Sequence, residues 1–466
     1  MGIGHPVSMP TPPPPPSSSH GARLKKKTVS SPGQRSSSFL FLLFLVWCHC
    51  GEAETVSFRP KALVAPIGKD PSTLQYYITL ALKTPLRSER LVFSLGGSFL
   101  GIDSDTYVSS TYRHVQCRTS QCVAASSGVC CSCGTCSGPR SPSCGNNTCV
   151  VGPYNPFIST STSGDVLEDV LAIHSTDGKT RGPPVSVPHF VFSGAGAFLT
   201  KGLTASARGV AGLGRGKVGL PAQLSAKFRF RRKFAVCLSG SSTSPGVVFF
   251  GPGPYVLQPD KDVSQGLTYT PLLLNPVSTS GAFFQGQKSD EYFIEVKGFN
   301  IGEKPVVGLI STLLKIDSEG DGGTKISTVD PYTMLETSIY KAVTSAFVQQ
   351  AIGIGMERVS GVKPFEVCFS AKGVPSTRLG PAVPTIELLL DNGKVWGVFG
   401  ANSMVFTSNG ALCLGLVDGG VSPRTSIFIG AHQIEDDRLE FDLAYSRLGF
   451  WSSLLALQTT CANFKF

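Results

Sequence analysis

Short apolar runs separated by Gly, Pro, Ser and Asn dominate the chain from Leu74 onward. Runs of about four to eight apolar residues with such boundaries are typical of β-strands. The pattern predicts strands over Tyr76–Leu82, Leu91–Leu95, Val187–Phe192, Phe234–Leu238, Val247–Phe250, Tyr292–Val296, Ile386–Leu390, Val395–Phe399, Ala411–Val417, Ile427–Gly430 and Leu439–Asp442. The sequence therefore predicts an all-β protein with a few small helices.

Two helices stand out from this strand pattern. The longer one is predicted from Met334 to Gln350, because Thr333 and Glu336 match a Thr-x-x-Glu capping box. Its apolar face would consist of Ile339, Val343, Ala346 and Phe347. A shorter helix is predicted to start at Pro221.

Two segments lie in matching contexts about half a folded chain apart. Phe93–Gly97 and Lys325–Val329 each follow an apolar strand and close in a tight turn, and each contains a serine, Ser94 and Ser327. This repetition predicts two similar lobes facing each other across a cleft. We predict a leader over residues 1–53, a first lobe over 54–250 and a second lobe over 251–466.

The leader has the features of a secretory signal peptide preceded by a long Pro- and Ser-rich region. The basic residues Lys25–Lys27 precede the apolar run Phe39–Trp47, and small residues follow near Gly51. The apolar run is shorter than the roughly 20 residues that a bilayer span requires. The long region before it leaves a membrane anchor or an upstream false start as alternatives. We expect a secreted protein of the apoplast or cell wall, free of the membrane after signal cleavage.

The folded part of the chain is mildly basic. The sequence has 41 Lys and Arg and 31 Asp and Glu. Residues 1–53 contain five of the basic residues and one of the acidic residues. The remaining chain therefore has 36 basic and 30 acidic residues, a net charge of +6. Such a charge suits adhesion to acidic wall polysaccharide or to an acidic protein. The sequence contains no stripe of interleaved basic and aromatic residues, so it does not predict nucleic-acid binding. The cluster Arg229–Lys233 is interpreted as a solvated helix end that leads into a strand.

Twelve cysteines follow the leader, and an even number behind a signal peptide predicts a disulfide framework. Eight of them lie within residues 117–149, together with a glycosylation sequon at Asn146. The twelve are Cys117, Cys122, Cys130, Cys131, Cys133, Cys136, Cys144, Cys149, Cys237, Cys368, Cys413 and Cys461. The Cys131–Cys136 segment is also compatible with zinc, but no histidine pair lies nearby, so we predict no metal site and no cofactor.

Several longer stretches together are distinctive. They are Phe58–Leu63, Tyr107–Tyr112, Gly209–Arg215, Arg232–Gly240, Gly322–Thr333, Ile427–Asp437 and Thr459–Phe464. Over about residues 57–466 the chain resembles the plant extracellular dermal glycoproteins and xyloglucan-specific endoglucanase inhibitors. Basic 7S globulins and wheat-type xylanase inhibitors are more distant relatives. The resemblance implies a pepsin-like, bilobal aspartic protease fold, secretion to the cell wall and no proteolysis.

The chemistry of the two matching segments agrees with a lack of proteolysis. Ser94 and Ser327 stand where a bilobal aspartic protease carries the Asp of its Asp-Thr-Gly triplets. Proteolysis requires two facing carboxylates that share a proton and activate water, and a serine hydroxyl does neither near neutral pH. The stretch that matches the flap, Pro156–Thr160, contains no tyrosine. The chain is therefore predicted not to be an enzyme.

The chain also departs from the resembling family in its first lobe. Many relatives keep an Asp at the position of Ser94, and they have cysteines where this chain has Ser104 and Gly194. They have Trp near Gly101 as well. The joint loss of cysteines at 104 and 194 fits the loss of one bridge between them.

The resemblance implies a protein that blocks microbial endoglucanases or xylanases in plant defence. Such hydrolases carry paired carboxylates in an open cleft, which the planar fork of an arginine can satisfy. In the family, a loop of the second lobe reaches the target enzyme, so Arg424 in loop 418–425 is the predicted inserted residue. Arg358 and Arg378 are weaker candidates in the same lobe.

Two other functions stay open. The first is a wall or seed binding protein of basic 7S globulin type that holds a peptide, a receptor or a polysaccharide in its cleft. The second is a true aspartic endopeptidase, in which Asp103, Asp105 or Asp330 would replace the missing carboxylates. Asp330 lies three positions past Ser327, beyond the turn apex, so its side chain is not expected to reach the partner position.

Overall fold

Alternating burial of side chains orients the strands of the first lobe around a core. In β2 (Tyr76–Leu82), Tyr76, Ile78, Leu80 and Leu82 are buried while the residues between them are partly exposed. This period of two places every second side chain on the core face of a sheet.

The computed structural model describes residues 59–125, 147–279 and 286–466, and the backbone of 129–131. The predicted leader lies outside these residues.

The largest sheet in the described residues has 15 strands and runs from the first lobe into the last part of the chain. Its order is β17-β34-β33-β13-β14-β1-β2-β3-β12-β4-β11-β10-β7-β6, with β5 paired to β10. Besides β2, the strands are β1 (Ala62–Lys69), β3 (Arg87–Ser94), β4 (Leu100–Asp103), β5 (Arg113–His114), β6 (Val129–Cys131), β7 (Thr148–Val151), β10 (Gly164–Thr176), β11 (Arg181–Ala195), β12 (Gly209–Gly212), β13 (Lys233–Cys237), β14 (Gly246–Phe250), β17 (Thr268–Pro271), β33 (Arg438–Asp442) and β34 (Arg447–Trp451).

Smaller sheets build the second lobe. A five-stranded sheet has the order β18-β21-β32-β22-β31, and two four-stranded sheets have the orders β20-β19-β27-β28 and β23-β24-β30-β29. Their strands are β18 (Phe293–Ile294), β19 (Val296–Ile301), β20 (Lys304–Pro305), β21 (Thr324–Ile326), β22 (Thr333–Leu335), β23 (Arg358–Val359), β24 (Cys368–Ser370), β27 (Ile386–Leu390), β28 (Val395–Val398), β29 (Met404–Phe406), β30 (Ala411–Leu414), β31 (Leu416–Asp418) and β32 (Ile427–Ile429). Two-stranded pairs join β8 (Tyr154–Asn155) to β9 (Thr160–Ser161), β15 (Val256–Leu257) to β16 (Lys261–Asp262), and β25 (Ser376–Thr377) to β26 (Gly380–Pro381).

The helices are short apart from one. They are α1 (Ser120–Ala124), α2 (Leu220–Phe228), α3 (Thr337–Gly353) and α4 (Gly400–Ser403), with 3-10 turns η1 (Ala197–Thr200), η2 (Asp391–Gly393), η3 (Ala431–Ile434), η4 (Leu454–Leu457) and η5 (Cys461–Asn463). None of the helices in the described part of the chain is long and apolar enough to cross a membrane. The predicted all-β architecture with few helices is confirmed.

The long helix begins later than its sequence suggests. The predicted start at Met334 falls inside strand β22, and α3 begins at Thr337. Glu336 is itself the N-cap, because its carboxylate accepts hydrogen bonds from the backbone N–H groups of Ser338 and Ile339 at 2.8 and 3.2 Å. The Thr-x-x-Glu pattern therefore marked the correct region but assigned the cap to the wrong residue.

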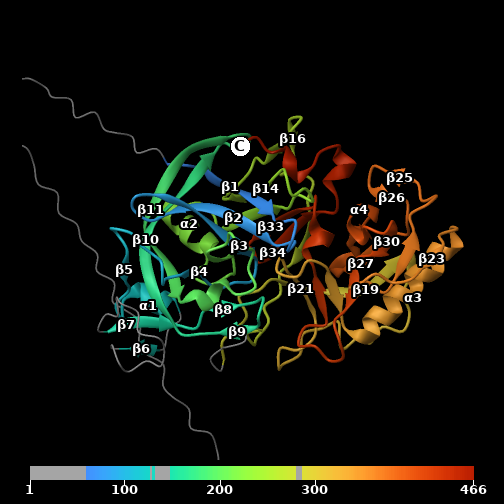
Figure 1. Ribbon diagram of the computed structural model, residues 1–466, viewed down its shortest axis with the longest axis horizontal. Coiled ribbons are helices and arrows are strands. Elements are labelled where there is room, and N and C mark those ends of the chain that lie inside the picture. Colours follow the sequence, from blue (N-terminus) through green and yellow to red (C-terminus); the bar gives the residue numbers. More distant parts are fainter. Residues whose placement is uncertain (1–58, 126–128, 132–146, 280–285) are drawn as a thin grey trace, which may run out of the picture. The chain divides into compact units, whose positions relative to one another are not determined.

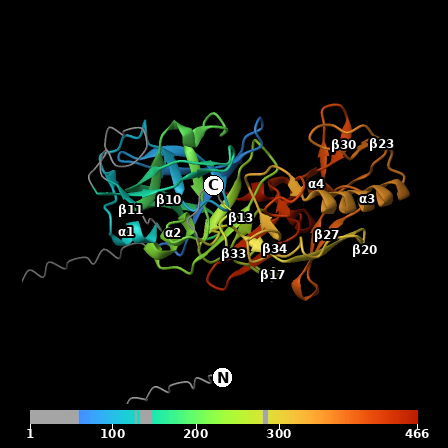
Figure 2. The ribbon, with the colours of Figure 1, turned by 90° about the horizontal axis from the view of Figure 1, so that it is seen from below.

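A shared sheet joins the two halves of the fold. Strand β13 from the first lobe pairs along its whole length with β33 near the C-terminus. Figures 1 and 2 show β33 and β34 between the blue-green strands of the first lobe and the orange-red second lobe. The rings of Phe234 and Phe441 stack across this pairing with centroids 4.7 Å apart, and Tyr292 packs on Phe441 at 4.6 Å. Pairing and aromatic packing together hold one half against the other.

Three disulfides have both of their cysteines within the described residues. They join Cys122 to Cys149, Cys237 to Cys461, and Cys368 to Cys413. Cys117 is also disulfide-bonded. The side chains of Cys130 and Cys131 lie outside the described residues, as do Cys133, Cys136, Cys144 and the sequon at Asn146.

Ser104 and Gly194, where the resemblance implies that relatives carry cysteines, are neighbours in space. A Cβ atom built on Gly194 in β11 would lie 3.0 Å from the Cβ atom of Ser104. Strands β4 and β11 run in parallel here, and the Ser104 N–H donates to the Ala195 carbonyl at 2.8 Å. The spacing is close to that of a disulfide, which requires about 3.5–4.5 Å between Cβ atoms. The Leu167 Cδ1 atom, 2.4 Å from the same point, would have to rotate away.

We predict that the double variant Ser104→Cys/Gly194→Cys forms a bridge and raises the free energy of unfolding by about 2–4 kcal/mol, because it restricts the unfolded chain. Free-thiol titration would detect the bridge, and urea unfolding would measure the gain. The single variant Ser104→Cys is the control and should show no gain. Two free thiols in the oxidised double variant would contradict the prediction.

Buried acidic groups surround the contact between β2 and the segment before β33. The hydroxyl of Tyr76 and the ammonium of Lys69 both reach Glu435 Oε1 at 2.6 Å. The next residue, Asp436, accepts from the Cys461 N–H at 2.8 Å, and burial raises its pKa to about 6. Burial also raises the pKa of Asp437, which accepts a hydrogen bond from the Trp396 indole at 2.9 Å. Asp436 and Asp437 therefore hold protons more tightly in the folded protein than in the unfolded chain. Glu435 does not, because the effect of burial on its pKa is outweighed by the hydrogen bond and charge of His432 and the charge of Lys69, which lower the pKa.

Asp436 is therefore predicted to contribute stability that is lost as the pH rises from about 4 to about 6. Because folding raises the pKa of Asp436 from 3.8 to about 6, its contribution is present in acid and is lost as the pH rises through the folded value. Replacing Asp436 by Asn should make the fall in melting temperature smaller, and the amide oxygen can still accept from Cys461. The exposed residue Asp260, replaced by Asn, is the matched control. Identical pH profiles for Asp436→Asn and the parent chain would contradict the assignment.

Candidate binding cleft

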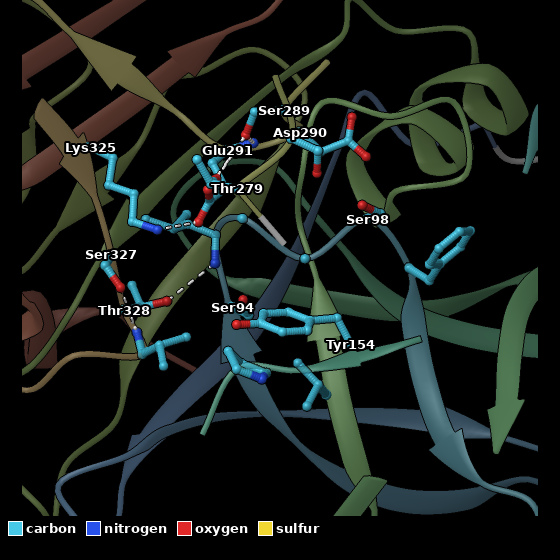
Figure 3. Close-up of a pocket in the computed structure, with 18 of the residues that line it drawn as sticks. Ser94, Ser98, Tyr154, Thr279, Ser289, Asp290, Glu291, Lys325, Ser327 and Thr328 are labelled. Carbon is cyan, nitrogen blue, oxygen red and sulfur yellow. Dashed lines mark hydrogen bonds and ion pairs between the residues drawn. The ribbon is translucent and has the colours of Figure 1, made fainter. Parts of the chain in front are cut away.

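A cleft of about 540 Å³ lies between the lobes and is lined by residues from both of them. Ser94 ends strand β3, and Ser327 directly follows strand β21. Both serines line the cleft and are buried, with 4 % and 8 % of their surface exposed. Figure 3 shows Ser94, Ser327, Lys325 and Glu291 around this space. The structure thus brings together the two segments that the sequence singled out.

Matching strand arrangements place the two serines. Strand β3 runs parallel to β12, with Ser94 opposite Gly212, and β21 runs parallel to β32, with Ile326 opposite Ile429. Each serine therefore lies at the carboxyl end of a strand in a parallel pair, where the backbone turns away from the sheet. This local similarity accounts for the matching sequence contexts.

In the described part of the chain, only the turn of the second lobe contributes a side-chain hydroxyl to the contact between the two turns. The Thr328 hydroxyl donates to the Phe93 carbonyl at 2.8 Å and accepts from the Leu95 N–H at 3.2 Å. Leu95 holds the corresponding position in the first lobe, is 1 % exposed and has no hydroxyl to return the contact. One threonine side chain therefore satisfies two buried backbone groups of the other lobe.

Asp330 lies closer to the cleft floor than its place in the turn suggested. It lines the cleft, and its Oδ2 atom accepts a hydrogen bond of 2.7 Å from the Ser327 hydroxyl. The same hydroxyl accepts from the N–H groups of Val329 and Asp330 at 3.2 and 3.3 Å. The Ser94 hydroxyl makes no hydrogen bond within the described residues. Asp103 and Asp105, the other candidate substitutes, are not among the residues that line the cleft.

An ion pair occupies the space above the first turn. Lys325 Nζ lies 2.7 Å from Glu291 Oε1, and it also lies 4.6 Å from the centre of the Phe428 ring. Gly96 is required beneath this pair, because a Cβ atom there would lie 2.5 Å from the Glu291 side chain. The sequence could have suggested Lys325, which shares a strand face with Ser327, but nothing in it pointed to Glu291.

A second acidic side chain lies beside this pair. Asp290 also lines the cleft, and burial raises its pKa, an effect that a hydrogen bond from Ser98 and the charge of Arg215 partly offset. The neighbouring charge of Glu291 raises it further. The carboxyl of Asp290 therefore protonates more readily than an exposed one does.

A hairpin from the first lobe borders the cleft. Strands β8 and β9 pair across the turn 156–159, and Tyr154, Pro156 and Ser159 line the cleft. Figure 3 shows Tyr154 on the same side as Ser94. The segment Pro156–Thr160 does lack a tyrosine, as the sequence shows, but Tyr154 supplies an aromatic ring from just before it.

Of the three candidate arginines, one lines the cleft and two lie elsewhere. Arg424, in the loop between β31 and β32, lines the cleft. Its Nε atom lies 3.2 Å from Asp321 Oδ1, its Nη1 atom donates to the Ser278 carbonyl at 3.1 Å, and 42 % of its side chain is exposed. Arg358 lies in β23 over the Phe369 ring, and Arg378 lies in the turn between β25 and β26. Neither of these two lines the cleft.

The groups in the cleft suit binding by hydrogen bonds and charge. Its floor and walls hold the hydroxyls of Ser94, Ser278, Thr279, Ser289 and Ser327, with the ion pair Lys325–Glu291 and the cation of Arg424. Across the described ranges, no group of three or more His, Cys, Asp or Glu side chains is arranged to hold a metal ion. A cleft lined by polar groups from both lobes can hold a polar ligand or a protein loop.

Comparison with solved structures defines the class of fold. The crystal structure of an aspartic proteinase from Irpex lacteus matches 86 % of this chain with a TM-score of 0.53 at 14 % identity. A likeness at this identity shows the fold alone, which is the pepsin-like arrangement of two β lobes around a cleft.

The family follows from closer matches. The models of the "Xylanase inhibitor N-terminal" and "Xylanase inhibitor C-terminal" families match residues 76–252 and 291–452. A protein of Nicotiana benthamiana named "Probable aspartic proteinase GIP2" is 52 % identical over 91 % of this chain and 96 % of its own. The crystal structure of edgp has a TM-score of 0.85 and 53 % identity over 88 % of this chain and 99 % of that chain.

More distant relatives include basic 7S globulins. Basic 7S globulin from Glycine max is 36 % identical over 92 % of this chain and 95 % of its own. The crystal structure of conglutin gamma from lupine seeds has a TM-score of 0.74 and 36 % identity over 88 % of this chain and 100 % of that chain. The chain belongs to this xylanase-inhibitor-like family of pepsin-fold proteins, as the resemblance predicted.

The one-sided contact at the cleft floor gives a direct test. We predict that Thr328→Val lowers the free energy of unfolding by about 2–4 kcal/mol, because the Leu95 N–H and the Phe93 carbonyl would both be buried without a partner. Urea unfolding measures the loss. The exposed residue Thr312, replaced by Val, should change stability by less than about 0.5 kcal/mol. A similarly small effect for Thr328→Val would show that these groups find other partners.

Proposed function

We propose that this protein is a secreted, non-proteolytic inhibitor of microbial cell-wall glycoside hydrolases that acts in plant defence. Its target would be a xyloglucanase, another endoglucanase or a xylanase. The observation that most strongly supports this proposal is the match of both lobes to xylanase-inhibitor families, combined with a cleft floor that contains Ser94 and Ser327. Secretion to the apoplast or cell wall is supported by the signal-like leader and by the disulfides.

The state of the carboxylates in the cleft supports the absence of proteolysis. A pepsin-type mechanism requires two facing carboxylates that share one proton and hold a water between them. Asp330 instead accepts a hydrogen bond from Ser327, and Glu291 is neutralised by Lys325. A hydroxyl cannot ionise water near neutral pH, and the loss of a single general acid–base group costs about 10²–10⁴-fold in rate.

Arg424 is the proposed contact with the catalytic carboxylates of the target. Its loop is exposed beside the cleft, and Asp321 holds the guanidinium in place before the target arrives. This intramolecular pair is weak because both partners are about half exposed, with 42 % and 53 % of their side chains accessible. Exchange of Asp321 for two carboxylates in a closed interface would then favour the complex.

A second candidate function uses the cleft itself. A wall or seed binding protein could hold a peptide or an oligosaccharide among the hydroxyls between the lobes, and the relatedness to basic 7S globulin and conglutin gamma favours this alternative. An aspartic endopeptidase is the third candidate, favoured only by the names of relatives from Nicotiana benthamiana and Glycine max that are called probable aspartic proteinases. Each candidate predicts a different result for the same purified protein.

The test is a panel assay of the purified secreted protein against fungal xyloglucanases, xylanases and denatured casein. We predict inhibition of at least one hydrolase and no casein cleavage at acid pH. In Arg424→Ala the inhibition constant should rise at least about tenfold, the equivalent of about 1.4 kcal/mol, because the target carboxylates lose their partner. The matched control Arg87→Ala, at an exposed residue of the first lobe outside the cleft, should inhibit as the parent chain does, and both variants should melt normally.

Other outcomes assign the protein elsewhere. Unchanged inhibition by Arg424→Ala would remove this residue from the mechanism and leave the inhibitor function standing. Capture of a wall peptide or oligosaccharide without inhibition of any hydrolase would favour the binding protein. Casein cleavage that a transition-state peptide inhibitor blocks would establish the endopeptidase.

A further inference from the structure

Positive charge gathers at the C-terminal end of helix α2, away from the cleft. The helix ends at Phe228, with Lys227 in its last turn and Arg229 as the left-handed C-cap. Arg59 joins them from the first described residues, because its Nε atom donates to the Phe228 carbonyl at 2.8 Å. Lys227, Arg229 and Arg59 are all exposed. The helix end therefore presents three cations to solvent, where the helix dipole favours them.

Two more arginines extend this charge onto the shared sheet. Arg231 and Arg447 both bind the carboxylate of Asp442, each with its Nε atom 3.2 Å from one carboxylate oxygen. Asp442 is fully buried, whereas 36 % and 39 % of the two arginine side chains are exposed. The negative charge thus lies inside the protein while both guanidinium groups keep a face toward solvent. The group as a whole displays positive charge.

An exposed aromatic ring lies among these guanidinium groups. Tyr445 is 65 % exposed, the Cζ atom of Arg231 lies 3.7 Å from its ring centre, and that of Arg447 lies 5.1 Å away. Cation–π contacts hold the ring in one orientation. A rigid exposed ring beside cations offers both stacking area and charge to one ligand.

The sequence around this surface is unusually one-sided in charge. Residues 178–259 contain 11 Lys and Arg and not one Asp or Glu, whereas residues 54–466 as a whole have 36 against 30, or +6. The rest of residues 54–466 therefore has 25 against 30, or −5, so the excess positive charge of the folded part comes from this segment. Single-sign charge concentrated in one part of a protein attracts polyanions.

We propose that the surface formed by Arg59, Lys227, Arg229, Arg231, Arg447 and Tyr445 binds a uronate polysaccharide, a sugar polymer with a carboxylate on each unit. Guanidinium groups bind carboxylates with paired hydrogen bonds, and the sugar face can stack on Tyr445. A single exposed ring gives a poor platform for single-stranded nucleic acid, which uses successive aromatic side chains. None of the six residues lines the cleft, so polymer binding and cleft binding can occur together.

The test measures binding of the full-length secreted protein to polygalacturonate by retention and titration at low ionic strength. The variant Lys227→Gln/Arg229→Asn removes two charges, and Asn suits the left-handed backbone at 229. Arg231 and Arg447 stay in place because Asp442 depends on them. The matched control Lys304→Gln/Lys372→Gln removes two exposed charges from the second lobe. Tyr445→Ala tests the ring.

We expect the parent chain to bind polygalacturonate and to release it as salt is raised. The α2-end variant should bind at least about tenfold more weakly, Tyr445→Ala about threefold more weakly, and the control as the parent chain does. Inhibition of hydrolases should not change in any of them. Equal weakening in the control, equal binding of fully methyl-esterified polymer, or tighter binding of single-stranded DNA at equal charge would each overturn the proposal.

Discussion

The pairing of β13 with β33 is the constraint on which the rest of the structure depends. It joins a strand of the first lobe to a strand near the C-terminus, and the Cys237–Cys461 disulfide and the Phe234–Phe441 stack reinforce the same junction. Because the junction fixes one half of the fold against the other, the turns after β3 and β21 meet at a defined distance. The cleft and its floor follow from that junction.

At the cleft floor, the polar groups of the two turns are engaged with one another. Ser327 binds Asp330, Lys325 binds Glu291, and Thr328 holds the opposite turn. These groups are hydrogen-bonded or ion-paired, which stabilises the site. Such a floor fits a protein that binds through its cleft rim and loops, with Arg424 on the rim.

Charge is organised separately from the cleft. The positive residues at the end of α2 form a surface with Tyr445, whereas Glu435 and Asp437 are buried, and Asp436 is partly buried, near the contact between β2 and η3. The raised pKa values of Asp436 and Asp437 favour the folded state in acid, whereas the lowered pKa of Glu435 acts in the opposite direction.

The sequence by itself determined the strand pattern, the repetition around Ser94 and Ser327 and the family, because these depend on local periodicity and on contiguous motifs. It placed β2 and β27 at their observed bounds and put Ser104 beside Gly194. It could not show that Glu291 covers Gly96, that Asp330 turns back to Ser327, or that Asp321 holds Arg424. Those contacts join residues that only the packing of distant strands brings together. Helix α3 shows the same limit, because the pairing of Thr333–Leu335 as a strand overrode a local capping signal.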